Sequence, residues 1–175
     1  MDVKTAFLHG NLEEKIYMEQ PEGFIQKGSE NIVCLLKKSL YVLKQSPRQW
    51  YLRFDQFMIA HGYLRSQYDS CVYCKFLPLR DEIYLLLYVD DMLIACKHIE
   101  EIEKLKSELR SEFEMKDLGS ANEILGMQVK KDKAAKNLFL TQASYVRKVL
   151  SKFDMVTTKA VSTSLGTHFK LSKQQ

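Results

Sequence analysis

The chain has 175 residues, enough for one domain with a hydrophobic core and too few for two domains of ordinary size. Its apolar fraction of 46% and charged fraction of 27% are typical of a globular protein and exclude a fibrous or low-complexity chain. The net charge of +4 only weakly favours polyanionic partners.

Neither a membrane span nor an export signal is predicted. The longest apolar run, residues 83–89, is far shorter than the roughly 20 residues that a spanning helix needs. Asp2 and Lys4 stand where a signal peptide would have its apolar core. The four cysteines are expected to be free thiols, and the lone C-x-x-C of Cys71 and Cys74 lacks the partners of a zinc site. We therefore expect an intracellular, cytoplasmic protein without a membrane partner.

The first part of the chain contains two weak strand candidates and one clear helix. Residues 16–18 and 32–36 are short apolar stretches that weakly favour strands. Ser46 is a suitable N-cap, Pro47 suits the first helical position, and Gly62 provides a stop. Because aromatic and apolar residues at helical spacing lie between them, we expect a helix that begins at Ser46 and ends before Gly62, with its aromatic stripe in the core.

The middle of the chain predicts a sheet and a second helix. A strand over residues 71–76, a loop over 78–82 and a hairpin over 84–96 follow one another. Residues 99–113 carry an apolar stripe opposite a charged face and are expected to form a helix. Residues 115–119 are expected to form a turn.

The last part of the chain repeats this mixture of strands and helix. Residues 124–131 and 138–141 predict paired strands across a basic loop, and residues 142–153 predict a third helix. The tail beyond Thr157 lacks periodicity and is expected to be loose. Strands interleaved with helices around a central hairpin favour an α+β fold, in which helices cover one face of an antiparallel sheet.

Lysine and arginine residues are clustered along the chain. They gather within residues 37–53, 130–136 and 147–152. Such clusters are typical of surfaces that contact a phosphate backbone, but solvated helix faces have the same composition. Both interpretations stay open.

The tip of the predicted central hairpin is unusual. Tyr88, Val89, Asp90 and Asp91 stand between two apolar runs, where a hairpin usually has Asn-Gly, Asp-Gly or a glycine pair, because the favoured turns need positive φ. Adjacent carboxylates repel each other unless a proton or a cation compensates. Carboxylate oxygens are ligands that Mg²⁺ prefers. The quartet therefore predicts a divalent metal site, and the alternative is an ordinary solvated Asp-Asp turn.

Five segments form an ordered set of motifs. They comprise residues 2–10 with 18–24, then residues 39–50, 88–91, 113–119 and 124–127. Their sequences and order resemble the motifs of copia-type retrotransposon reverse transcriptases. The resemblance covers nearly all of the chain, and five motifs in order are highly specific. It implies a partial reverse transcriptase domain over residues 1–156, palm-like with the fingers missing, and a polar tail over residues 157–175.

This resemblance implies RNA-directed DNA synthesis by two-metal nucleotidyl transfer. In that reaction a primer 3′-hydroxyl attacks the α-phosphate of a deoxynucleoside triphosphate and pyrophosphate leaves. By resemblance, Asp2 and Asp90 would bridge the two Mg²⁺ ions, with Asp91 beside them and Mn²⁺ as the alternative metal. The implied partners are an RNA template, a DNA primer and deoxynucleoside triphosphates.

Further roles follow from the resemblance alone. Lys116 would donate a proton to pyrophosphate, or is simply an exposed turn lysine. Phe7 would pack beneath the incoming sugar, or is a core residue. The backbone at residues 125–126 would lie at the primer. The residues assigned to nucleotide and template binding are Phe7, Lys44, Gln45, Arg48 and Tyr88.

Three features depart from the family pattern. The family usually has glycine where this chain has Val42. It also usually has glycine in place of Cys96 and proline in place of Ser164, which are differences in turn geometry. Met1 directly precedes Asp2, so the segment that should carry Asp2 into the sheet and the basic fingers are missing. We expect Asp2 to fray and DNA synthesis by this chain alone to be weak or absent.

The sequence interpretation is therefore the palm of a copia-type reverse transcriptase, separated from the other polyprotein domains. A non-catalytic nucleic-acid-binding remnant is the alternative, and a decayed reading frame is the third hypothesis. The three differ in primer extension, in the salt dependence of RNA binding and in folding.

Overall fold

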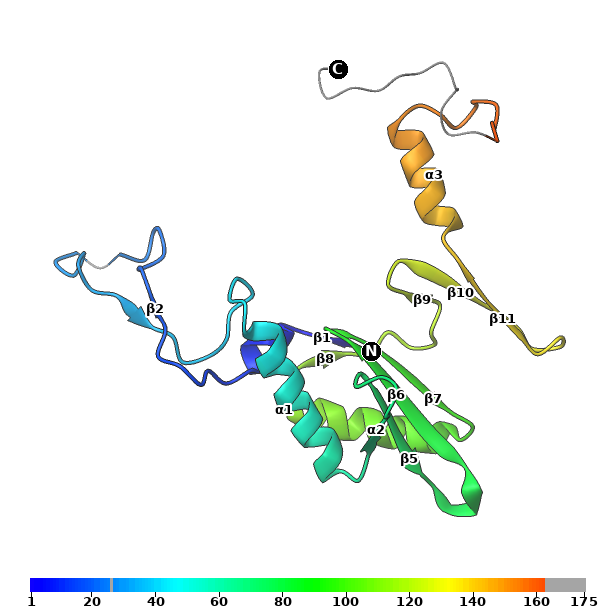
Figure 1. Cartoon of the computed structure of the whole chain (residues 1–175), viewed down its shortest axis with the longest axis horizontal. Coiled ribbons are helices and arrows are strands. Elements are labelled where there is room, and N and C mark those ends of the chain that lie inside the picture. The colour runs from blue at the N-terminus through cyan, green and yellow to red at the C-terminus, as the bar shows by residue number, and fades with distance from the viewer. Residues whose placement is uncertain (26, 163–175) are drawn as a thin grey trace. The chain divides into compact units, whose positions relative to one another are not determined.

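The computed structural model describes residues 1–25 and 27–162. The chain divides into two compact units, Met1–Ala121 and Asn122–Gln175, each of which is described by itself. Three α-helices and several antiparallel sheets are distributed over the described residues (Figure 1). The predicted mixture of helices with antiparallel strands is confirmed. Among these described residues, no helix is long and apolar enough to cross a membrane.

A six-stranded sheet with the order β4-β5-β6-β7-β1-β8 forms the centre of the first unit, and all its neighbouring strands are antiparallel. Its strands are β1 (Asp2–Val3), β4 (Leu64–Arg65), β5 (Val72–Phe76), β6 (Glu82–Tyr88), β7 (Asp91–Cys96) and β8 (Met115–Lys116). The predicted strand over residues 71–76 and the predicted hairpin over 84–96 are confirmed.

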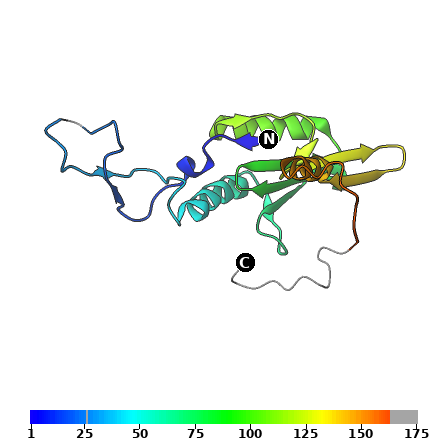
Figure 2. The ribbon, with the colours of Figure 1, turned by 90° about the horizontal axis from the view of Figure 1, so that it is seen from above.

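Two helices, α1 (Ser46–Ala60) and α2 (Ile99–Glu112), pack against this sheet (Figures 1 and 2). Side chains along β6 alternate between buried and exposed positions, as in a strand with one covered face. The buried set joins one core with side chains of both helices, so both helices cover the same face, as predicted. The core residues from these elements are Trp50, Phe54, Phe57, Met58, Ile83, Leu85, Leu87, Leu105 and Leu109.

The chain start is part of the sheet. The amino group of Met1 donates a hydrogen bond to the carbonyl of Met92 (2.9 Å), and the Met92 amide donates to the Met1 carbonyl (2.8 Å). The Val3 amide donates to the Asp90 carbonyl (2.9 Å). The expected fraying of Asp2 is therefore wrong, because backbone bonds hold the chain on both sides of it.

The predicted turn over residues 115–119 is wrong in its first part. Residues 115–116 form β8, which pairs with β1 so that Val3 lies opposite Met115. The cause is tertiary pairing. One edge of β1 pairs with β7, and residues 115–116 pair with its other edge. Local turn propensity gives way to this pairing.

The remaining short elements of the first unit are two strands, β2 (Tyr17–Met18) and β3 (Cys34–Leu35), and two 3₁₀ turns, η1 (Ala6–His9) and η2 (Pro78–Arg80). β2 and β3 pair with each other, as the weak strand signals predicted.

The start of α1 differs from the prediction by one residue. Gln45 is the N-cap and Ser46 lies inside the helix. The Ser46 hydroxyl is buried, accepts a hydrogen bond from Ser39 (2.6 Å) and donates one to the Leu40 carbonyl. The hydroxyl therefore ties the preceding loop to the helix instead of capping it.

The second unit contains a three-stranded antiparallel sheet and one helix. The sheet has the order β11-β10-β9, with β9 (Glu123–Ile124), β10 (Met127–Asp132) and β11 (Asn137–Thr141), and α3 (Ala143–Lys152) follows. The single strand predicted over residues 124–131 is divided, because Leu125 and Gly126 both have positive φ, 51° and 73°. The predicted third helix is confirmed. Ser164 and the tail from residue 163 lie outside the described residues.

Candidate acidic site

The turn between β6 and β7 is a two-residue loop under strain. Tyr88 lies opposite Asp91 in the ladder, and Val89 and Asp90 form the loop between them. Val89 has a φ of 56°. Left-handed backbone is common for glycine and asparagine but unfavourable for a β-branched residue. The positive φ that the turn requires is thus supplied by valine, at a cost that surrounding contacts must offset.

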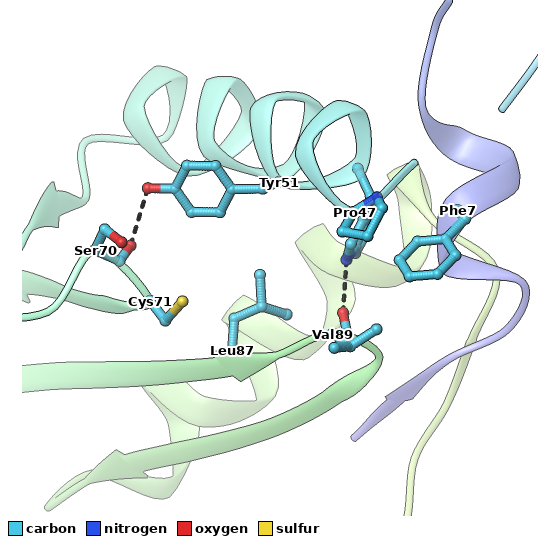
Figure 3. Close-up of a pocket in the computed structure, with 8 residues that line it drawn as sticks. Phe7, Pro47, Tyr51, Ser70, Cys71, Leu87 and Val89 are labelled. Carbon is cyan, nitrogen blue, oxygen red and sulfur yellow. Dashed lines mark hydrogen bonds between the residues drawn. The ribbon is translucent and has the colours of Figure 1, made fainter. Parts of the chain in front are cut away.

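Two hydrogen bonds from other elements hold this loop. The indole Nε1–H of Trp50, on α1, donates to the Val89 carbonyl at 2.6 Å; the dashed line to Val89 in Figure 3 marks this bond. The Val3 amide, on β1, donates to the Asp90 carbonyl. The loop is therefore anchored from the helix on one side and from β1 on the other.

Four strands align a row of polar side chains next to the turn. In the register of the sheet, Tyr88 lies opposite Asp91, Asp91 opposite Asp2, and Asp2 opposite Lys116. Directly opposed residues of antiparallel strands project to the same face. Because Val3 and Leu87 belong to the buried core, this row occupies the face that the helices leave open.

The carboxylates of the row influence one another. The pKa of Asp91 is raised, chiefly because burial disfavours its charged form and further because Asp90 and Asp2 carry like charges; the amino terminus acts in the opposite direction. Asp2, Asp90 and Asp91 thus share one electrostatic site although the first is far from the other two in sequence.

The carboxylate oxygens of these residues are the kind of ligand that a magnesium ion prefers. Among the described residues, no group of three or more His, Cys, Asp or Glu side chains is gathered to hold a metal. Mg²⁺ in nucleotide enzymes is usually held by one or two carboxylates, with substrate phosphates and water as its other ligands. The opposed pair Asp2 and Asp91 matches that pattern. The register opposes Asp2 to Asp91, whereas Asp90 lies in the loop itself.

Lys116 is an exposed residue, as one sequence interpretation had it, but it belongs to β8 and not to a turn. Its position opposite Asp2 brings an ammonium group to the open face beside the acids. The local pattern of residues 113–119 did not indicate this proximity, because it depends on the pairing of β8 with β1; only the family resemblance implied a role for Lys116 in the same reaction as the acids.

Phe7 packs against the core, as one of its two sequence interpretations had it. Its ring centroid lies 4.5 Å from that of Tyr41, and the side chain also lines an apolar pocket of about 290 Å³ (Figure 3). The pocket lies between η1, the start of α1 and the β6–β7 turn. Its lining residues are Phe7, Pro47, Trp50, Tyr51, Ser70, Cys71, Leu87 and Val89.

The predicted nucleotide-binding residues of the second motif surround the start of α1. Lys44 and Arg48 are exposed and Gln45 is the half-buried N-cap. Val42 is 92% exposed and is not among the residues with positive φ, so valine imposes no backbone strain there.

Trp50 is the residue whose role sequence reasoning missed. Its place in an aromatic stripe predicted core packing, and it is indeed 2% exposed. Periodicity carries no information on where an indole N–H points. The only available signal was that a buried indole N–H requires an acceptor.

The comparisons with known proteins agree on one family. The family model described as "Reverse transcriptase (RNA-dependent DNA polymerase)" matches residues 1–166. The chain is 54% identical over 174 residues to the "Retrovirus-related Pol polyprotein from transposon TNT 1-94" of Nicotiana tabacum, a match that covers 99% of the chain and 13% of the relative. It is 36% identical to the corresponding polyprotein from transposon RE1 of Arabidopsis thaliana, over 98% of the chain and 12% of the relative.

A shorter relative supports the same assignment. The putative transposon Ty5-1 protein of Saccharomyces cerevisiae is 32% identical over 94% of the chain and 53% of its own length. No solved structure matches the chain. The chain spans about an eighth of the two plant polyproteins, 13% and 12% of their lengths. Because the family model matches residues 1–166, the chain belongs to the reverse transcriptase family. It is a reverse-transcriptase-like domain of the type found in the Pol polyproteins of copia-type retrotransposons.

Proposed function

We propose that this chain forms the palm of a reverse transcriptase and that the row on its open sheet face is the site of nucleotidyl transfer. The observation that carries the proposal is the register that aligns Asp91, Asp2 and Lys116 across three neighbouring strands. Two acids and a lysine on one rigid sheet match the needs of a reaction in which anionic oxygens enter and leave a phosphate. In this proposal the palm domain extends over residues 1–156.

The proposed roles follow from position and chemistry. Asp2 and Asp91, with Asp90 beside them, would hold a divalent cation, Mg²⁺ or Mn²⁺. Bound there, such ions would supply positive charge to the attacking and departing oxygens. The Lys116 ammonium, opposite Asp2, would donate a proton or a hydrogen bond to pyrophosphate.

The substrates in this proposal are an RNA template, a DNA primer and deoxynucleoside triphosphates. Phe7, half-buried beside the turn, would support the incoming sugar. Tyr88 lies in the same row as the acids. The exposed cations near the start of α1, Lys44 and Arg48, and the helix N-cap Gln45 would contact phosphate and template, since a helix N-terminus favours anions.

A specific observation favours a second candidate, nucleic-acid binding without catalysis. Residues 122–162 contain eight lysines and arginines against three acids. Within that described stretch, none of the basic side chains is in an ion pair. Unpaired cations of this kind are free to contact a phosphate backbone whether or not the acidic site works.

Primer extension with the whole chain tests the proposal. A DNA primer on an RNA template, Mg²⁺ and excess protein allow a weak single-turnover reaction to be measured. Asp2→Asn and Asp91→Asn should each reduce extension by about 100-fold or more, the scale of losing a positioned electrostatic group. Asp154→Asn removes an exposed carboxylate far from the row in sequence and is the matched control.

Two outcomes contradict the proposal in different ways. If Asp2→Asn and Asp91→Asn extend primers as well as the unsubstituted chain, the row is not the reaction site. If the unsubstituted chain shows no extension but binds the template-primer with a steep salt dependence that Asp91→Asn leaves unchanged, the second candidate is correct.

A further inference from the structure

The turn that carries Asp90 is held in an unfavourable backbone conformation. Val89 has a φ of 56°, although its side chain is β-branched. Such a residue keeps this conformation only where the surroundings enforce it. The ladder itself ends at the pair of Tyr88 and Asp91, so it does not fix the two loop residues.

Asp90 is fixed through the peptide groups on both of its sides. The peptide group that precedes it contains the Val89 carbonyl, which accepts the Trp50 indole N–H at 2.6 Å. The peptide group that follows it contains the Asp90 carbonyl, which accepts the Val3 amide at 2.9 Å. With both peptide planes set, the direction of the Asp90 Cα–Cβ bond is set as well, because two peptide planes define φ and ψ of the residue between them.

The donor from α1 is rigid. Trp50 is 2% exposed, and its ring contacts three other rings. The centroid distances are 5.3 Å to Phe113, 5.5 Å to Phe54 and 5.8 Å to His9. A ring held on three sides delivers its N–H to one point in space, which a flexible polar side chain does not do.

Core packing alone does not account for this arrangement. Filling the space requires a large apolar ring, and a ring without an N–H would meet that need as well. The N–H adds nothing to packing and must find an acceptor when buried. Here its acceptor is the carbonyl of the strained loop residue.

We propose that Trp50 is a positioning residue: its indole N–H fixes the peptide group between Val89 and Asp90 and so orients the acidic turn. The consequence for nucleotidyl transfer depends on the proposed function, whereas the consequence for the turn itself does not. Two readouts therefore separate the claims.

The first readout is the turn. Trp50 is the only tryptophan of the chain, so one indole ¹H–¹⁵N signal reports on this bond. We expect that signal to exchange slowly with solvent and to broaden when Mn²⁺ is titrated into the whole chain. Trp50→Phe should speed amide hydrogen exchange at Asp90 and Asp91 by at least about tenfold relative to the unsubstituted chain, the equivalent of a lost hydrogen bond.

Two further variants separate the N–H from packing. Benzothienylalanine at position 50 has sulfur in place of the N–H and keeps the shape of the ring, so it should reproduce the exchange effect with little loss of stability. Phe54→Leu is the packing control: it disturbs the ring that contacts Trp50 but leaves the indole N–H in place. It should lower the melting temperature without selective exchange at the turn.

The second readout is activity. If the proposed function holds, Trp50→Phe should lower kcat for primer extension about tenfold with KM for the nucleotide nearly unchanged, whereas Phe54→Leu should preserve kcat below its melting temperature. The positioning role is overturned if the sulfur isostere leaves exchange at Asp90 and Asp91 as in the unsubstituted chain, or if Phe54→Leu produces the same exchange pattern. Absence of extension in every variant, with the exchange effect present, would overturn the proposed function and leave the positioning role standing.

Discussion

Met1–Ala121 contains a buried apolar core and internal ion pairs, whereas the described part of the second unit, residues 122–162, contains neither. All 16 buried hydrophobic residues of the described chain belong to the first unit. That unit has 16 lysines and arginines against 19 acids, and the ion pairs of the described residues all lie within it. Residues 122–162 have eight basic residues against three acids.

The difference separates a unit with a packed core from a described stretch whose side chains are largely exposed. In the first unit, the Trp50 indole and a backbone hydrogen bond from β1 hold the turn beside the acidic row. In residues 122–162, exposed aromatic side chains stand beside unpaired cations, for example Phe139 (53% exposed) opposite Lys130 in the β10–β11 ladder. Aromatic faces and cations together are what single-stranded nucleic acid requires of a partner.

The largest expected effect is on the core of the first unit. Phe54 is fully buried and contacts the rings of Trp50, Tyr73 and Phe113. Phe54→Ala should cost about 3–5 kcal/mol of unfolding free energy, because it removes a ring and leaves a cavity. Phe139→Ala, in the exposed β11, should change it by no more than about 0.5 kcal/mol. Urea titration followed by circular dichroism measures both, and equal losses would refute the contrast between the units.

The next largest effect is expected at a buried carboxylate whose hydrogen-bond donors all belong to the first unit. Asp55 is 8% exposed and accepts hydrogen bonds from Arg65 (2.9 and 2.6 Å) and from the Tyr73 hydroxyl (3.0 Å). Asp55→Ala removes the acceptor of a buried hydroxyl and of a guanidinium, so we expect a loss of about 2–3 kcal/mol. Asp132→Ala removes only one bond, to the Ala135 amide of an exposed hairpin.

The expected cost of Asp132→Ala is below about 1 kcal/mol. The same urea titration compares the two alanine variants. A loss for Asp55→Ala no larger than that for Asp132→Ala would mean that the internal network contributes nothing to the first unit.

Sequence reasoning succeeded where the signal was local. Helix α1 begins and ends within a residue of its predicted limits, because Pro47 and Gly62 act on their own backbone. The β6–β7 hairpin was predicted from two apolar runs around a turn. By contrast, strand β8 was not predicted, because two residues carry no strand signal of their own and pair only once β1 is in the sheet. A role for Lys116 followed from the resemblance alone.

The candidate site shows the same division. The acids Asp2, Asp90 and Asp91 were recognisable as residue types, but which of them face each other depends on register. The bond from Trp50 to the Val89 carbonyl joins two elements, and no periodicity encodes it.

A smaller effect should appear in nucleic-acid binding by the second unit. The variant that replaces four lysines of the β10–β11 hairpin by glutamine should weaken binding to a template-primer about tenfold at 0.15 M salt, since cations that contact phosphate release counterions. The log–log salt slope should become shallower by about one for each lysine that contacts a phosphate. The substituted residues are Lys130, Lys131, Lys133 and Lys136.

A matched quartet in the first unit is the control, since two of its members are already in ion pairs. Its residues are Lys75, Lys97, Lys104 and Lys106. If this control quartet changes the salt slope as much as the hairpin quartet does, the phosphate-contacting surface is not confined to the second unit.

The smallest effect is on the acidic row itself. The raised pKa of Asp91, caused first by burial and then by Asp90 and Asp2, means that the folded chain binds its proton more readily than the unfolded chain does. Stability therefore falls as the pH rises from the ordinary carboxyl range, about 4, through the raised pKa. At neutral pH without metal, Asp91→Asn should slightly raise the melting temperature, and below pH 4 the gain should vanish.

Asp154→Asn, which removes an exposed carboxylate from the second unit, is the control for this measurement. Its melting temperature should match that of the unsubstituted chain at both pH values, because Asp154 is an exposed residue that follows α3 and lies in no strand. Mg²⁺ should raise the melting temperature of the unsubstituted chain more than that of Asp91→Asn, since only the former keeps both opposed carboxylates. A lower melting temperature for Asp91→Asn at neutral pH would mean that the Asp91 carboxylate stabilises the fold. Repulsion among the carboxylates of the row would then not be a net cost to stability.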